Sequence, residues 1–164
     1  QLSRRRISQE VYEQECANLA RLQAQEFVLE GGTAKDRLIA NSKLCAQRNR
    51  CQRVIDRYKS QDAEPKLPME LHVFRVGEVA FASNRFELYM DFMHRIQARS
   101  PALQTFIIQL AGSDAGCGSG SYLATERGVA GKGYSATQYC NLVSPEGGQE
   151  LVEETLADLH ALWS

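Results

Sequence analysis

The sequence lacks several motifs that would assign it directly to a familiar class of protein. It contains no C-x-x-C pair, so a structural zinc knuckle held by paired cysteines is not expected. It contains no H-E-x-x-H motif, and its three histidines lie far apart, at His72, His94 and His160. It also contains no G-x-S-x-G element, which α/β serine hydrolases use to present their nucleophile. This chain by itself therefore does not predict a complete histidine-based metal site.

Long apolar runs and an excess of charge are missing as well. No apolar stretch approaches the ~20 residues that a transmembrane helix needs, and no signal peptide is visible. The net charge is −1, which argues against general electrostatic capture of nucleic acid or membrane. Because the chain begins at Gln1 rather than Met, we expect a processed or truncated product. We predict no transmembrane segment and no nucleic-acid partner.

The cysteines give little information about the compartment of the protein. There are five of them, an odd number with irregular spacing: Cys16, Cys45, Cys51, Cys117 and Cys140. Buried reduced thiols are the favoured interpretation, because free cysteine behaves as a small apolar residue. One disulfide stays open as an alternative if the protein is exported.

The first third of the chain predicts two helices. Apolar residues recur every three or four positions within 8–27 and again within 35–58, which is the helical period. Gly31 and Gly32 lie between the two segments, and Thr33 is a good N-cap for the second. Residues 35–59 hold eight basic residues against two acidic ones. We interpret this as a solvated helix face, and binding of an anionic partner is the weaker alternative.

The rest of the chain alternates between strand and helix signals. Residues 70–76 and 79–82 read as a hairpin around Gly77. Asn84 is a candidate N-cap for a helix with an apolar stripe of Phe86, Tyr89, Met90, Met93 and Ile96. The continuous apolar run 105–110 predicts a central strand covered on both faces. A glycine-rich loop at 112–120 and a helix near 149–163 follow.

These signals predict a mixed α/β fold in which two N-terminal helices precede β-β-α-β-loop-α. We expect this to be part of a larger layered α/β domain. The composition suggests a division into a helical segment and linker, 1–66, and an α/β portion, 67–164.

Three residues of the α/β portion are candidates for chemistry. Glu87 lies three residues after Asn84, so it either completes a helix capping box or serves as a metal ligand at a strand end. Tyr122 and Tyr134 flank a glycine-rich turn. A tyrosine in such a position is commonly a packing residue, but a phenol can also ligate a metal or donate to an oxyanion.

Four short motifs occur in an order that resembles the C-terminal part of the catalytic region of neutral and alkaline (non-lysosomal) ceramidases. They are S-N-R-F-E at 83–87, S-Y-L-A-T-E-R at 121–127, G-K-G-Y-S at 131–135 and P-E-G-G-Q-E-L-V at 145–152. The resemblance covers roughly 67–163. It implies that the chain is a piece of a zinc-dependent amidohydrolase.

The resemblance also implies roles for individual residues. Glu87 and Tyr122 would complete a zinc site begun by two histidines in an upstream region of the same protein, and Tyr134 would bind the oxyanion. The substrate would be a lipid amide or another amide, and the whole protein would be exported. Without the upstream region, zinc would be absent and the chain inactive as an enzyme. The alternative is a non-catalytic interaction or structural module of the same superfamily, in which Glu87 is only a helix cap.

The chain departs from the family's pattern at three positions. Arg85 stands where the family prefers Pro or Gly, Ala124 replaces a proline, and Ser135 follows Tyr134 where many members have Glu. These differences bear on substrate contacts. A guanidinium at Arg85 could also neutralise the Glu87 carboxylate and compete with a metal.

Overall fold

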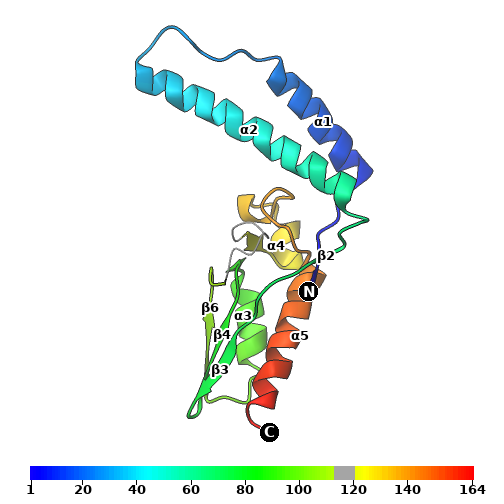
Figure 1. Cartoon of the computed structure of the whole chain (residues 1–164), viewed down its shortest axis with the longest axis vertical. Coiled ribbons are helices and arrows are strands. Elements are labelled where there is room, and N and C mark those ends of the chain that lie inside the picture. The colour runs from blue at the N-terminus through cyan, green and yellow to red at the C-terminus, as the bar shows by residue number, and fades with distance from the viewer. Residues whose placement is uncertain (113–120) are drawn as a thin grey trace. The chain divides into compact units, whose positions relative to one another are not determined.

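The fold is mixed α/β, as predicted, and is divided into two compact units. The computed structural model describes residues 1–112 and 121–164 (Figure 1). One unit comprises Arg6–Ala63, and the other comprises Gln1–Arg5 together with Glu64–Ser164. The expected division at 66/67 differs from this one in residues 1–5 and 64–66, which belong to the C-terminal unit. The glycine-rich segment 113–120, with Cys117, lies outside the described residues.

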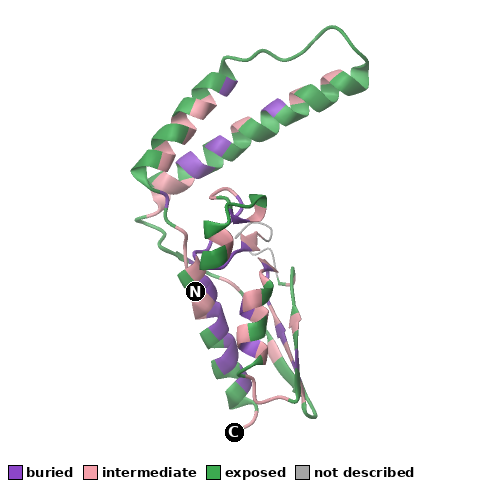
Figure 2. Cartoon of the chain, turned by 180° about the vertical axis from the view of Figure 1, so that it is seen from behind, coloured by how far each residue is buried: buried purple, intermediate pink, exposed green. Residues whose placement is uncertain are grey.

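The helical unit consists of α1 (Gln9–Gln23) and α2 (Ala34–Ser60), close to the predicted ranges. Thr33 caps α2 as expected and forms a reciprocal capping box with Asp36. The unit has a small core in which Leu22 packs with Leu44 and Cys51. Because this core is thin, most of both helices is exposed, as the green stretches of their ribbons in Figure 2 show.

A three-stranded sheet forms the centre of the second unit. Its strands are β3 (Val73–Val76), β4 (Val79–Ser83) and β6 (Gln104–Ile108), in the order β3-β4-β6. The predicted hairpin is confirmed: β3 and β4 are antiparallel, and Gly77 takes the positive φ of 61° in the turn between them. β6 returns parallel to β4 after a helix.

Two helices, α3 (Met90–Gln97) and α5 (Pro145–Ala161), pack together to build the core of this unit (Figure 1). Buried residues form a continuous stripe along α5 (Figure 2). The predicted inward residues of the last helix are confirmed at Val152, Leu156 and Leu159, which are at most 3% exposed. α5 begins four residues earlier than predicted because Ser144 caps it and Pro145 occupies its first turn.

The prediction that Asn84 caps a helix is wrong. The helix begins at Met90, and its N-cap is Tyr89, which makes no side-chain capping bond. The Asn84 side chain instead accepts a hydrogen bond from the Phe86 amide at 3.0 Å, forming a tight turn after β4. Phe86 is fully buried in the core ahead of the helix. The alternative in which Glu87 completes a capping box with Asn84 is therefore also wrong.

The prediction that residues 105–110 form a strand covered on both faces is wrong as well. In the described part of the chain, β6 is the edge strand of its sheet. Thr105 is buried, but Phe106 is 48% exposed and Ile108 is 40% exposed. One face of the strand packs on the core, and the alternate side chains point to an open face.

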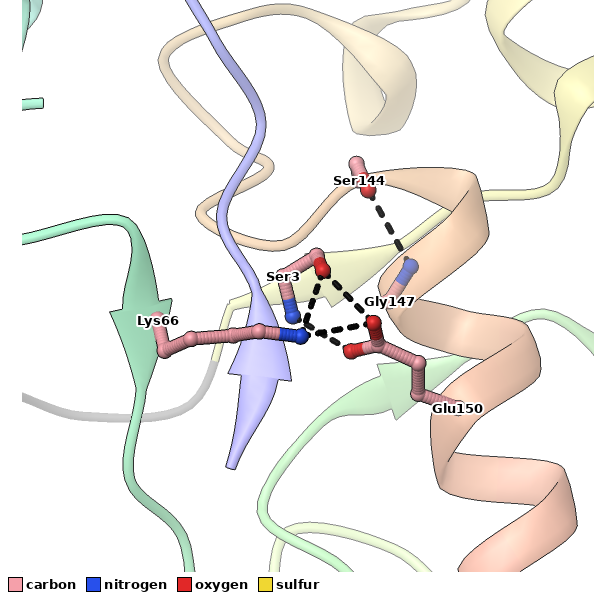
Figure 3. A network of polar contacts seen from close by, with 5 residues as sticks. All are labelled: Ser3, Lys66, Ser144, Gly147 and Glu150. Atoms are coloured by element: carbon pink, nitrogen blue, oxygen red, sulfur yellow. Dashed lines mark hydrogen bonds and ion pairs between the residues drawn. The ribbon is translucent and has the colours of Figure 1, made fainter. Parts of the chain in front are cut away.

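The first residues of the chain are tied to the C-terminal unit. β1 (Leu2–Ser3) pairs with β2 (Lys66–Leu67) in antiparallel register. The Glu150 carboxylate accepts hydrogen bonds of 2.6 Å from the backbone amide and the hydroxyl of Ser3, and pairs with Lys66 at 2.7 Å (Figure 3). Partial burial alone would raise the pKa of Glu150, but the bonds from Lys66 and Ser3 outweigh it and lower that pKa.

The cysteines match the favoured interpretation in part. Cys51 and Cys140 are buried, Cys45 is exposed, and the four cysteines in the described ranges are free thiols. Within residues 1–112 and 121–164, no helix is long and apolar enough to cross a bilayer.

Candidate functional site

The candidate site is built on two very short strands. β5 (Glu87–Leu88) and β7 (Tyr122–Leu123) pair in parallel, with Glu87 directly opposite Tyr122. Backbone bonds hold the pair at both ends, from the Glu87 amide to the Ser121 carbonyl and from Tyr89 to Leu123, each 3.1 Å. Two residues far apart in the sequence are thereby fixed side by side.

The burial pattern of these strands decides which side chains reach the surface. Phe86, Leu88 and Leu123 are at most 5% exposed, so they anchor the strands in the core. Side chains alternate along a strand, and register partners in neighbouring strands point to the same face. Glu87 and Tyr122, both partly exposed, therefore project together on the side opposite the core.

The Glu87 carboxyl and the Tyr122 phenol are in direct contact. A side-chain hydrogen bond to Glu87 is the main reason that the pKa of Tyr122 lies above its ordinary value of 10.0, and the carboxylate charge adds to it. The phenol is consequently held in its neutral, proton-donating form. The two predicted metal ligands converge on one point.

Tyr134 lies beside this pair. It begins the short 3₁₀ helix η1 (Tyr134–Ala136), and its ring meets the Tyr122 ring edge-on, with centroids 6.3 Å apart. Tyr134 is 59% exposed, so it lies at the surface of the unit. The structure brings all three predicted site residues together.

The donor set fits part of a zinc site. A glutamate oxygen and a tyrosine oxygen are both acceptable zinc ligands, and the strand register places the two residues side by side. Among the described residues, no group of three or more His, Cys, Asp or Glu side chains could hold a metal. Glu87 and Tyr122 can therefore supply two ligands, and further ligands would have to come from elsewhere.

Hydrogen bonds from the segment at the end of β6 hold the backbone around Glu87 in place. The Asn84 amide donates to the Ile108 carbonyl and its own carbonyl accepts from Ala111, both at 2.9 Å. The Leu88 amide donates to the side chain of Gln109 at 2.8 Å. These bonds fasten β5 to the end of β6. Arg85, the residue that the sequence places as a competitor for the Glu87 carboxylate, is 9% exposed.

Sequence reasoning missed a residue that holds the two tyrosine segments together. Asn141 is 1% exposed, and its side-chain oxygen accepts from the Ala124 amide at 2.9 Å. Its side-chain nitrogen donates to the carbonyls of Ser135 and Thr137. One side chain thus joins the segment after Tyr122 to the segment after Tyr134. The only signal in the sequence is an asparagine between the apolar neighbours Cys140 and Leu142.

Tyr89 makes a second link between these segments. Its hydroxyl lies 2.6 Å from the hydroxyl of Ser135, the residue after Tyr134. Its ring packs against Gly128 in α4 (Glu126–Ala130), where an added Cβ would lie 2.4 Å from the ring. Thr125 caps α4. The 121–127 and 131–135 motifs are thus parts of one packed surface around the site.

The contact between Glu87 and Tyr122 predicts a measurable titration. Glu87→Ala should lower the pKa of Tyr122 toward 10.0, because both its hydrogen bond and its charge are removed. Since the folded chain holds this phenolic proton more tightly than the unfolded chain, its contribution to stability is complete below about pH 10 and is lost as the pH rises. Phenolate absorbance, with Tyr122→Phe as the subtraction blank, measures the midpoint.

The control for this titration is Glu154→Ala, which removes an exposed carboxylate from α5. Its Tyr122 midpoint should match that of the unmodified chain. An unchanged midpoint in Glu87→Ala would contradict the contact.

Comparison of the chain with protein-family models, with curated proteins and with solved structures gave no match. The structure defines the class as a mixed α/β protein that carries a surface cluster of one carboxylate and two phenols.

Proposed function

We propose that this chain is part of a zinc-dependent amidohydrolase of the neutral ceramidase type. In this proposal Glu87 and Tyr122 are two of the zinc ligands, and Tyr134 donates a hydrogen bond to the oxygen of the amide carbonyl as it becomes negative. An upstream region of the same protein supplies the histidine ligands. The observation that carries the proposal is the direct contact between Glu87 and Tyr122, with Tyr134 against the same ring.

The chemistry of these residues suits the proposed roles. Bound zinc would lower the pKa of a coordinated water, so that a nucleophile forms near neutral pH. The pKa of Tyr122 lies above its ordinary value, chiefly because of the hydrogen bond with Glu87, and a phenol must lose its proton to ligate a metal. Metal binding at this pair should therefore release a proton and strengthen as the pH rises. Tyr134 is exposed, and its phenol is a group that can donate a hydrogen bond to an oxyanion.

The proposal is tested on the complete polypeptide, including the region that precedes Gln1. After dialysis against a weak chelator, the unmodified protein should retain about one zinc ion per chain, because a catalytic site with three or four ligands binds zinc tightly. Glu87→Gln should lose the zinc, and Tyr122→Phe should weaken binding at least ~10-fold. Metal analysis gives the zinc content per chain, and competition with a coloured chelator gives the zinc affinity.

Two further variants separate metal binding from catalysis. Tyr134→Phe should keep its zinc and lower kcat for amide hydrolysis by about 100-fold with little change in KM, because it acts on the transition state. Glu154→Gln, a change on the exposed face of α5, should alter neither zinc content nor kcat. Full zinc occupancy in Glu87→Gln would overturn the proposal and leave the contact with Tyr122 as a structural link between β5 and β7.

A further inference from the structure

Two tyrosine rings of the candidate site stand at right angles, with a carboxylate beside them. The Tyr122 and Tyr134 rings make an angle of 79°, and their centroids are 6.3 Å apart. This separation lies in the upper part of the range of about 4.5 to 7 Å over which aromatic rings pair. The Tyr122 phenol is hydrogen-bonded to Glu87, so the carboxylate lies at the edge of the ring pair. We call Glu87, Tyr122 and Tyr134 the aromatic corner.

The aromatic corner lies at the surface but is held from below. Tyr134 is 59% exposed, and Glu87 and Tyr122 are partly exposed. The register of β5 with β7 fixes Glu87 beside Tyr122. The buried Asn141 side chain joins the segment after Tyr122 to the segment after Tyr134. A ligand would therefore meet rings that are already in place, which lowers the entropy cost of binding.

All three side chains of the aromatic corner favour a positive charge. The face of an aromatic ring carries negative electrostatic potential, and the carboxylate adds a full negative charge. The hydrogen bond to Glu87 raises the pKa of Tyr122 above its ordinary 10.0, and the carboxylate charge adds to this rise. The tightly held phenolic proton reports the same negative surroundings.

The spacing of the two rings suits an organic cation. Elsewhere in the chain, the guanidinium carbon of Arg75 lies 4.1 Å from the Trp163 ring centroid, and that of Arg48 lies 5.1 Å from the Phe27 centroid. A cation about 4.5 Å from the centroids of two perpendicular rings requires centroids about 6.4 Å apart. The observed 6.3 Å and 79° match this arrangement. Quaternary ammonium groups fit such sites because their methyl groups contact the rings and they carry no N–H donor.

We propose that the aromatic corner binds a quaternary ammonium group, with the Tyr122 and Tyr134 rings against its methyl groups and the Glu87 carboxylate as its counterion. This inference stands on the geometry of the three residues and does not rest on the proposed function. Zinc would use the same Glu87 oxygens, so the two cations would exclude each other. Free choline and the headgroup of phosphatidylcholine both present this group.

The test compares choline with dimethylbutanol, its uncharged carbon isostere. Each is titrated into the chain in the presence of EDTA, and binding is followed by NMR. Choline should bind at least ~10-fold more tightly, because two ring faces and a carboxylate favour its charge. Glu154→Gln, a change on the exposed face of α5, should preserve this difference. Equal affinities for the two compounds, or no binding of choline, would overturn the proposal.

Three variants assign the binding to the aromatic corner. Tyr134→Leu removes a ring and should weaken choline binding at least ~5-fold, whereas Tyr134→Phe keeps the ring and should stay within ~2-fold of the unmodified chain. Glu87→Gln should weaken binding about 5-fold and reduce its dependence on salt. A choline affinity that neither Tyr134→Leu nor Glu87→Gln changes would place the ligand elsewhere and defeat the proposal.

The same measurements separate this inference from the proposed function. Tyr134→Phe should lower kcat under the proposed function but leave choline binding unchanged. A complete protein that never binds zinc, from a chain that selects choline, would support the aromatic corner and defeat the proposed function. Zinc bound through Glu87, with no preference for choline over dimethylbutanol, would have the opposite meaning.

Vesicles identify the source of the quaternary ammonium group. Sedimentation of the chain with phosphatidylcholine vesicles, but not with phosphatidylglycerol vesicles, would identify a lipid headgroup. Selective binding of choline without sedimentation would identify a small soluble molecule. Either result supports the aromatic corner as the site.

Discussion

Gly147→Ala is expected to lower the free energy of unfolding by about 2 to 3 kcal/mol, although helix propensity alone predicts a gain of about 1 kcal/mol. Gly147 lies in the first turn of α5, where a Cβ would lie 2.4 Å from the carbonyl oxygen of Ser3 and 2.5 Å from Cγ1 of Val143. The obstacle at Ser3 is backbone, which cannot rotate away as the end of a side chain could.

The position of Ser3 makes relaxation difficult. Its carbonyl accepts from the Ser144 amide at 3.0 Å, and its amide and hydroxyl are both bound by Glu150 (Figure 3). A shift large enough to admit a methyl group at Gly147 would stretch these bonds and move Leu2, which is 2% exposed in the core. We therefore expect overpacking to outweigh the propensity gain.

Urea denaturation of the isolated chain measures this effect. The matched control is Gly133→Ala, since a Cβ at Gly133 would meet no atom within 4 Å and its backbone φ of −68° suits alanine. The control should change the unfolding free energy by less than about 0.5 kcal/mol. A Gly147→Ala variant as stable as the unmodified chain would show that β1 can move away from α5.

Asn141→Ala is expected to cost about 3 kcal/mol and to loosen the candidate site. The substitution leaves the buried Ala124 amide and the less buried carbonyls of Ser135 and Thr137 without their side-chain partner. A buried polar group that loses its partner costs about 1 to 3 kcal/mol. The total cost should stay below the sum of three such penalties, because the Thr137 carbonyl still accepts a hydrogen bond from the Cys140 amide.

The same variant tests whether Asn141 positions the two tyrosines. Near-ultraviolet circular dichroism should lose part of the tyrosine signal, since the edge-on contact of Tyr122 and Tyr134 depends on both segments staying in place. Asn49→Ala, a change at an exposed position of α2, should leave both stability and this signal nearly unchanged. A tyrosine signal unaffected by Asn141→Ala would mean that other contacts hold Tyr134.

Elements with a strong local pattern could be predicted from the sequence. The apolar period of α1 and α2, the capping box at Thr33 and the turn at Gly77 are determined by residues close together in the chain. The inward positions of α5 follow from its period in the same way. The start of α5 was missed because Ser144 and Pro145 mark a helix start ahead of two glycines, which weaken the helical signal.

Glu87 shows why elements that depend on contacts between distant segments could not be predicted from the sequence. Asn followed three residues later by Glu is a good helix start, and the local sequence offers no way to reject it. The backbone of Ser121 and the register with Tyr122 make Glu87 a strand residue instead. The motif resemblance selected three residues that lie close together in the structure. The roles of Asn84, which the sequence offered as a helix cap, and of Asn141 became visible only in the fold.

Strand β6 shows a related limit. Its continuous apolar run predicted a strand covered on both faces, whereas the described chain covers one. An apolar run by itself does not distinguish a strand face that packs on the core from one that stays exposed, as Phe106 and Ile108 do here.

The pairing of β1 with β2 makes the helical unit an insertion into a host domain. The host chain leaves at Arg5 and returns at Glu64, and the Arg4 amide bonds the Pro65 carbonyl at 2.9 Å across that point. Such a junction resembles the base of a hairpin, which a few turn residues could close. The inserted helices could therefore lengthen, shorten or be exchanged during evolution without moving Glu87, Tyr122 or Tyr134.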